Sequence, residues 1–149
     1  MVPEVSIIIT NYNYGKFISR CLRSCLSQSN VLYEVIVVDD CSTDDSFERI
    51  RPFSDQIRFF KTETNSGVAA AANLGIQNAR GQFFFRVDAD DYINKDMAYM
   101  MKKYLESNHD AFCVSSDYLL VDNEQNIIEQ VDSILSPIGC GIMFRIVHL

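Results

Sequence analysis

Asp88, Asp90 and Asp91 lie within a span of four residues in the segment 86–92, which directly follows the aromatic run 83–85. Carboxylates held this close repel one another, and the commonest reason for crowding them is a hard divalent cation bound through oxygen ligands. The alternative is a solvent-exposed acidic turn that caps the next helix, because a pattern as short as Asp-x-Asp often arises by chance. These residues are therefore candidates for a metal site, and the rest of the chain must decide between the two interpretations.

Polar side chains also follow two other apolar runs. The β-branched run 5–10 leads into Tyr12, and the run 35–38 leads into Asp39 and Asp40. The carboxyl ends of parallel strands meet along one edge of a sheet, where α/β proteins bind ligands. A tyrosine ring can stack on a nucleobase, a carboxylate can accept a hydrogen bond from a base N–H, and a cation can neutralise a diphosphate. The combination predicts a nucleotide site.

The elements that would position these side chains alternate between two patterns. Continuous apolar runs are typical of strands buried on both faces, and apolar residues at helical spacing predict helices between them. Alternation of strand and helix implies parallel pairing, so we expect an α/β fold with a mainly parallel sheet flanked by helices. The predicted strands are 5–10, 34–38, 57–61 and 82–87, and the predicted helices begin at Phe17 and after Ser42 and cover 68–79 and 94–105.

Local patterns add detail to these helices. The apolar stripe of the first helix leaves Arg20 outside it. Ser42 is suited to cap the second helix, with Asp45 as its reciprocal partner. The alanine-rich segment 68–79 has high helix propensity apart from Gly75, and its small residues would let a helix approach a neighbour closely.

The last forty residues carry a different pattern. Residues 111–121 and 127–131 flank a turn-rich link and predict a β-hairpin. Glycines precede the apolar stretch 142–149, which we expect to form a further strand. Because an apolar end leaves surface uncovered, we expect the isolated chain to self-associate as a homo-oligomer. Domains seldom stop on an apolar run, so we also expect missing sequence after Leu149.

Composition narrows the class of protein. The chain has 149 residues, 48% of them hydrophobic, which fits a single domain spanning 1–149. A net charge of -7 without a basic run argues against nucleic acid as a partner. Five cysteines, odd in number and without a Cys-x-x-Cys pair, favour reduced thiols in a cytoplasm. No apolar segment approaches the roughly 20 residues of a transmembrane helix.

Four segments together resemble the family-2 glycosyltransferases of the GT-A fold, a Rossmann-like nucleotide-diphospho-sugar transferase architecture. They occur in the family's order and span most of the chain, from about residue 5 to about residue 145. The four segments are Ser6–Asn13, Val37–Asp44, Asn65–Gly75 and Asp88–Asp91.

The resemblance assigns roles to individual residues. It implies that Thr10, Tyr12 and Asp40 hold the uracil end of a UDP-sugar and that Asp88 holds the ribose. It also implies that Asp90 binds the Mg²⁺ or Mn²⁺ ion that bridges the diphosphate. Further positions match the family's motifs and are candidates for binding the donor, namely Asp39, Asn65, Gly67 and Asn73.

The implied activity is metal-dependent, inverting transfer of a sugar from a UDP-sugar to a hydroxyl group. The acceptor would be a glycan or a lipid-linked molecule in surface polysaccharide or cell-envelope glycan synthesis, in the cytoplasm or at the inner face of the membrane. Two positions depart from the family pattern. Ala72 stands where the family commonly has arginine, and no acidic residue follows Asp132 to provide the family's catalytic base. We therefore expect a chain truncated before the catalytic-base segment, and we assign no catalytic residue.

Two other functions fit parts of the sequence. The chain could be a nucleotide-binding module without turnover, because the base is missing. The acids Asp39, Asp40 and Asp88 also faintly resemble the pocket of a phosphoaccepting receiver domain. That pattern places its paired acids after the first strand and requires a lysine after a later one, whereas no lysine follows Lys103. The receiver interpretation is therefore the weakest of the three.

Overall fold

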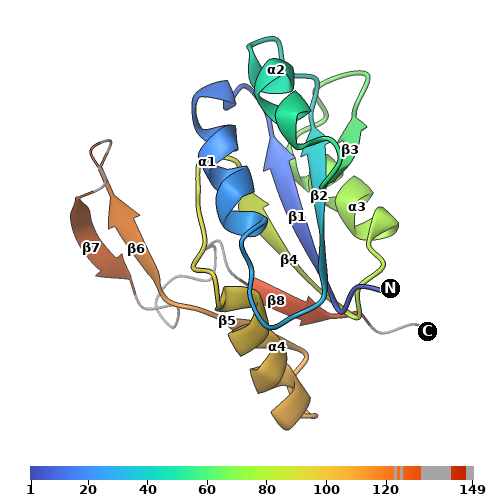
Figure 1. Ribbon diagram of the computed structural model, residues 1–149, viewed down its shortest axis with the longest axis vertical. Helices are drawn as coiled ribbons and strands as arrows, with labels where there is room; N and C mark the ends of the chain where they lie inside the picture. Colours follow the sequence, from blue (N-terminus) through green and yellow to red (C-terminus); the bar gives the residue numbers. More distant parts are fainter. Residues whose placement is uncertain (123, 125, 132–141, 147–149) are drawn as a thin grey trace.

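The computed structural model describes residues 1–122, 124, 126–131 and 142–146, and in this part of the chain a six-stranded sheet forms the centre (Figure 1). Four neighbouring strands run parallel, and the remaining two extend the sheet beside the last of them with antiparallel pairings. This confirms the predicted α/β fold with a mainly parallel sheet. In spatial order the strands are β3 (Arg58–Lys61), β2 (Tyr33–Asp39), β1 (Val5–Asn11), β4 (Phe83–Asp88), β8 (Ile142–Arg145) and β5 (Cys113–Ser115).

Helices cover both faces of this sheet (Figure 1). Buried side chains of α1 and α4 pack with one row of strand side chains, and α3 packs against the opposite row. Burial of two apolar faces explains why the central strands are almost entirely apolar. The helices are α1 (Gly15–Cys25), α2 (Ser46–Ile50), α3 (Val68–Asn78) and α4 (Met97–Ser107), and a 3-10 turn, η1 (Arg51–Phe53), follows α2.

Close contact between α3 and the sheet confirms the prediction from small residues. A Cβ added to Gly75 would lie 2.4 Å from Cγ2 of Ile8 on β1, a distance that real Cβ atoms do not adopt. Ala71, one turn earlier, is fully buried against the same face. The first turn of α3 therefore lies close to the carboxyl ends of β1 and β2.

Three sequence predictions need correction. β4 is not buried on both faces along its whole length, because Phe84 and Arg86 are half-buried where α3 covers the sheet incompletely. Ser42 does not cap a helix: α2 begins at Ser46, and the Ser42 hydroxyl instead donates to Asp39 Oδ1 at 2.5 Å. Segment 111–121 is not one strand but two, since only its first part pairs with the main sheet.

The predicted hairpin is confirmed, and it stands apart from the six-stranded sheet (Figure 1). It consists of β6 (Tyr118–Val121) and β7 (Ile127–Val131), paired antiparallel. The predicted last strand is confirmed for residues 142–145, whereas 136–141 and 147–149 lie outside the described residues. In the described part of the chain, no helix combines the length and the apolar character needed to cross a bilayer.

Candidate functional site

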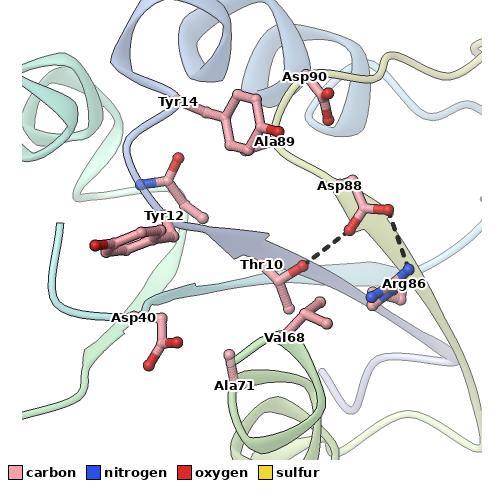
Figure 2. Close-up of a pocket in the computed structure, with 11 residues that line it drawn as sticks. Thr10, Tyr12, Tyr14, Asp40, Val68, Ala71, Arg86, Asp88, Ala89 and Asp90 are labelled. Carbon is pink, nitrogen blue, oxygen red and sulfur yellow. Dashed lines mark hydrogen bonds and ion pairs between the residues drawn. The ribbon is translucent and has the colours of Figure 1, made fainter. Parts of the chain in front are cut away.

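A cleft of about 350 Å³ lies at the carboxyl edge of the parallel strands. Four separate segments contribute to it: the end of β1, the end of β2, the first turn of α3, and the end of β4 with the loop that follows (Figure 2). Its position is the one where α/β sheets bind ligands. The lining residues are Thr10, Asn11, Tyr12, Tyr14, Asp40, Val68, Ala71, Arg86, Asp88, Ala89 and Asp90.

Asp88 is held in the cleft by two neighbours (Figure 2). The hydroxyl of Thr10 donates to Asp88 Oδ1 at 3.1 Å, and Nη2 of Arg86 lies 3.0 Å from Asp88 Oδ2. Thr10 and Asp88 are register partners on adjacent strands, so the sheet itself sets this geometry. The carboxylate keeps acceptor capacity for a ligand hydroxyl, because each carboxylate oxygen has two lone pairs.

Asp90 lies two residues beyond Asp88 at the rim of the same cleft (Figure 2). Its carbonyl oxygen accepts a hydrogen bond from Arg20 at 3.0 Å, while its carboxylate makes no hydrogen bond or ion pair with the other described residues. No group of three or more His, Cys, Asp or Glu side chains that could hold a metal is found among the described residues. A single carboxylate still suits Mg²⁺ or Mn²⁺, because such ions often bind through one or two carboxylates together with substrate phosphates and water. Asp90 is therefore the candidate ligand.

Asp40 forms part of the cleft wall and is only 3% exposed. Its carboxylate accepts hydrogen bonds from the Thr62 hydroxyl at 2.8 Å, from the Ser66 N–H at 3.0 Å and from the Gly67 N–H at 2.7 Å. Burial alone would raise the pKa of Asp40, but these hydrogen bonds outweigh it and lower the pKa below its ordinary value. Asp40 thus holds the loop that precedes α3, in addition to any contact with a nucleobase.

Asp39 does not line the cleft. It is buried beneath it, where Oδ1 accepts from Asn11 Nδ2 at 2.7 Å and Oδ2 accepts from the Ser42 N–H at 3.1 Å. This network ties the loop after β1 to the loop after β2. The role of Asp39 in the structure is therefore to shape the cleft from behind.

Three other predicted residues also lie outside the cleft lining. Asn65 is exposed, and its Oδ1 accepts a hydrogen bond from the N–H of Gly67 at 3.1 Å. Gly67 precedes α3 with φ +85°, a backbone conformation that favours glycine. Asn73 is exposed on α3. The structure therefore brings Thr10, Tyr12, Asp40, Asp88 and Asp90 together and leaves these three beside the cleft.

Sequence reasoning missed Arg86 and the two residues of α3 in the cleft. Arg86 carried a usable signal, because it is a charge within an apolar strand and lies two residues before Asp88, hence on the same face. Val68 and Ala71 gave no such signal, since small apolar residues also occur in ordinary helix cores. Tyr14 also lines the cleft and is 40% exposed.

A mainly parallel sheet with helices on both faces and a polar cleft at its carboxyl edge defines an α/β domain of the kind that binds nucleotides. The family model described as glycosyl transferase family 2 matches residues 6–135. The chain therefore belongs to glycosyl transferase family 2, and its fold is the GT-A fold.

Relatives and solved structures agree with this assignment. An "uncharacterized glycosyltransferase" of Haemophilus influenzae is 35% identical over 133 residues, covering 87% of this chain and 53% of that protein. TarS of Staphylococcus aureus, a poly(ribitol-phosphate) β-N-acetylglucosaminyltransferase, is 34% identical over 123 residues, covering 79% of this chain and 20% of TarS.

Two solved structures extend the comparison. TarS residues 1–349 in complex with UDP-GlcNAc superpose with a TM-score of 0.79 at 26% identity, covering 95% of this chain and 45% of that one. The mannosyltransferase PcManGT from Pyrobaculum calidifontis, in complex with GDP-Man and Mn²⁺, shares the fold with a TM-score of 0.70 at 24% identity. The match covers 82% of this chain and 36% of that one. The chain thus spans about half or less of the length of these relatives.

Proposed function

We propose that this chain binds the nucleotide of a UDP-sugar and that the protein transfers the sugar to a hydroxyl group of an acceptor. The observation that carries the proposal is the meeting of Thr10, Tyr12, Asp88 and Asp90 in one cleft, although they come from two distant parts of the sequence. The similarity to TarS, solved with UDP-GlcNAc, supports a uridine nucleotide as the carrier.

Each side chain has a role suited to its chemistry. The ring of Tyr12 is 42% exposed at the cleft and can stack on the uracil base. Asp88, held by Thr10 and Arg86, would accept hydrogen bonds from the ribose hydroxyls. Asp40 and Thr10 would complete the uracil end of the site, with Asp40 also fixing the loop before α3.

Charge explains why a cation belongs to this proposal. The cleft is lined by three aspartates and one arginine, and a nucleotide diphosphate is itself an anion. We propose Asp90 as the ligand of a Mg²⁺ or Mn²⁺ ion, in keeping with the Mn²⁺ present with the mannosyltransferase of the same fold. Such an ion would supply charge neutralisation of the leaving diphosphate.

Transfer with inversion requires in-line attack by the acceptor hydroxyl and a base for its proton. We assign no base, because no acidic residue follows Asp132, where the resemblance to the family would place it. The acceptor we propose is a glycan or lipid-linked hydroxyl compound of the cell envelope. TarS, whose name gives poly(ribitol-phosphate) as its acceptor, supports this class.

Calorimetric titration of UDP tests the donor site. The proposal predicts binding in Mn²⁺ that weakens at least about tenfold in EDTA, because the bridging charge is removed. Equal affinity in both buffers contradicts the role of the cation, and no binding in either contradicts the nucleotide site. Incubation with radiolabelled UDP-sugars and a hydroxyl acceptor such as poly(ribitol-phosphate) then separates a transferase from a nucleotide-binding module, since only the first moves the label to the acceptor and releases UDP.

A further inference from the structure

A row of polar side chains on and just after α1 holds the loop that carries Asp90. Arg20 and Ser24 are four residues apart on α1 and so lie on one side of the helix, and Gln28 follows in the segment after it. Each makes a hydrogen bond to the segment between β4 and α4. Arg20 Nη2 donates to Asp90 O at 3.0 Å, Ser24 Oγ accepts from Ile93 N at 3.1 Å, and Gln28 Nε2 donates to Asn94 O at 2.9 Å.

Arg20 lies at the end of this row that is nearest the cleft. Its guanidinium lies 4.6 Å from the centre of the Tyr92 ring as well as contacting the carbonyl of Asp90. The half-buried side chain is thus held between two residues of one loop, two positions apart. The apolar pattern of α1 had placed Arg20 outside the core-facing stripe, and the structure shows that it packs against this loop instead.

Arg20 is not among the residues that line the nucleotide cleft. It borders a second hollow, to which Asp88 and Asp90 also contribute. A side chain that holds the carbonyl oxygen of a residue restrains the peptide plane beside its Cα atom, and so limits the directions in which its Cα–Cβ bond can point. Arg20 can therefore set the position of the Asp90 carboxylate without contacting a nucleotide.

We propose that Arg20 is a positioning residue for the cation site, and that it holds the backbone of Asp90 so that the carboxylate is preorganised to bind the metal. This inference rests on the proposed function, in which Asp90 is the metal ligand. Groups that orient a metal ligand commonly change metal affinity by about 10–100-fold when they are removed.

The test compares Arg20→Met with Arg23→Met in the purified protein. Arg23 is a matched control, because it lies on the same helix three residues later and is exposed. UDP affinity is measured by calorimetry in Mn²⁺ and in EDTA, and Mn²⁺ binding is followed by electron paramagnetic resonance. We expect Arg20→Met to reduce the gain in UDP affinity caused by Mn²⁺ about tenfold, with the affinity in EDTA changed less than about twofold. Arg23→Met should match wild type in both buffers.

A second variant tests the same contact without replacing Arg20, in case Arg20→Met impairs folding. Tyr92→Leu removes the ring beside the guanidinium at a position that is 43% exposed, and we expect about a threefold loss of the same metal-dependent gain. If Arg20→Met and Tyr92→Leu both keep the wild-type gain, Arg20 has no positioning role. If wild type itself binds UDP equally in both buffers, the cation site is wrong and this inference is wrong with it.

Discussion

Thr10 Oγ1 donates a hydrogen bond to Asp88 Oδ1 at 3.1 Å, although 78 positions separate the two residues in the sequence. The contact exists because β1 and β4 are parallel neighbours whose register pairs these residues. Both strands end at the cleft, so the sheet delivers a hydroxyl and a carboxylate to the same place.

Replacing Thr10 with valine should weaken UDP binding while leaving the fold intact. Valine keeps the branched shape of threonine but cannot donate a hydrogen bond to Asp88. The contact of the Asp88 carboxylate with Arg86 remains. Losing one such hydrogen bond is worth about 1 kcal/mol, or roughly fivefold in affinity. Calorimetry with UDP measures the change, and Thr64→Val in an exposed loop is the control. Unchanged affinity in Thr10→Val would show that the contact does not serve binding.

Asp90→Asn should abolish most of the metal-dependent part of UDP binding. An amide is a poorer ligand for a hard cation than a carboxylate, so we expect at least about a tenfold loss in Mn²⁺ and little change in EDTA. Thermal stability should stay close to wild type, because the Asp90 carboxylate makes no hydrogen bond with the other described residues. Asp55→Asn, an exposed change elsewhere on the surface, provides the control. A full metal response in Asp90→Asn would require another ligand.

Asp40→Asn should reduce the free energy of unfolding at neutral pH by about 1–3 kcal/mol. The carboxylate accepts N–H groups from Ser66 and Gly67, and an asparagine amide would place its own donor against one of them. Urea unfolding at neutral pH measures the loss. Asp110→Asn, an exposed aspartate, should unfold like wild type.

The same variant gives a pH dependence whose sign follows from the pKa of Asp40. Because hydrogen bonds lower that pKa in the folded state, the unfolded chain takes up the proton first as pH falls. The stabilisation is complete above the ordinary aspartate pKa of about 3.9 and is lost as pH falls through the lowered folded value. The difference between wild type and Asp40→Asn should therefore shrink in acid. A difference that grows in acid would mean that the pKa is raised instead.

Gly75→Ala should destabilise the protein. A Cβ at this position would meet Cγ2 of Ile8 at 2.4 Å, so α3 or β1 must shift. Overpacking of this kind costs about 1–3 kcal/mol, more than the gain in helix propensity of up to about 1 kcal/mol. Thermal unfolding measures the loss. Gln77→Ala on the exposed side of α3 is the control and should be neutral or slightly stabilising. A melting temperature of Gly75→Ala at or above wild type would show that the interface between α3 and the sheet tolerates movement.

Much of the fold could be predicted because its signals are local. The apolar runs of β1 and β2 and the alternation with helices identify a parallel sheet, and polar residues directly after a strand must lie at its carboxyl edge. Tyr12, Asp40, Asp88 and Asp90 could therefore be named as neighbours without coordinates. Their convergence follows from strand direction alone, which the sequence pattern encodes.

Predictions of other features were wrong or missing because these features depend on contacts between distant segments. Serine is a residue type that often caps helices, yet the hydroxyl of Ser42 donates a hydrogen bond to Asp39 in a network that joins two loops. Arg20 lies outside an apolar stripe, and no local pattern distinguishes a solvent-exposed arginine from one packed against a loop 70 residues away.

The sequence by itself determined the class of fold, the edge of the sheet at which the cleft lies and most of the side chains gathered there, because strand and helix periodicity are properties of neighbouring residues. Only the tertiary structure decided which of those side chains face the cleft. Asp39 and Asp40 are adjacent in sequence, but one is buried beneath the cleft and the other forms its wall, because successive side chains at the end of a strand point to opposite faces of the sheet.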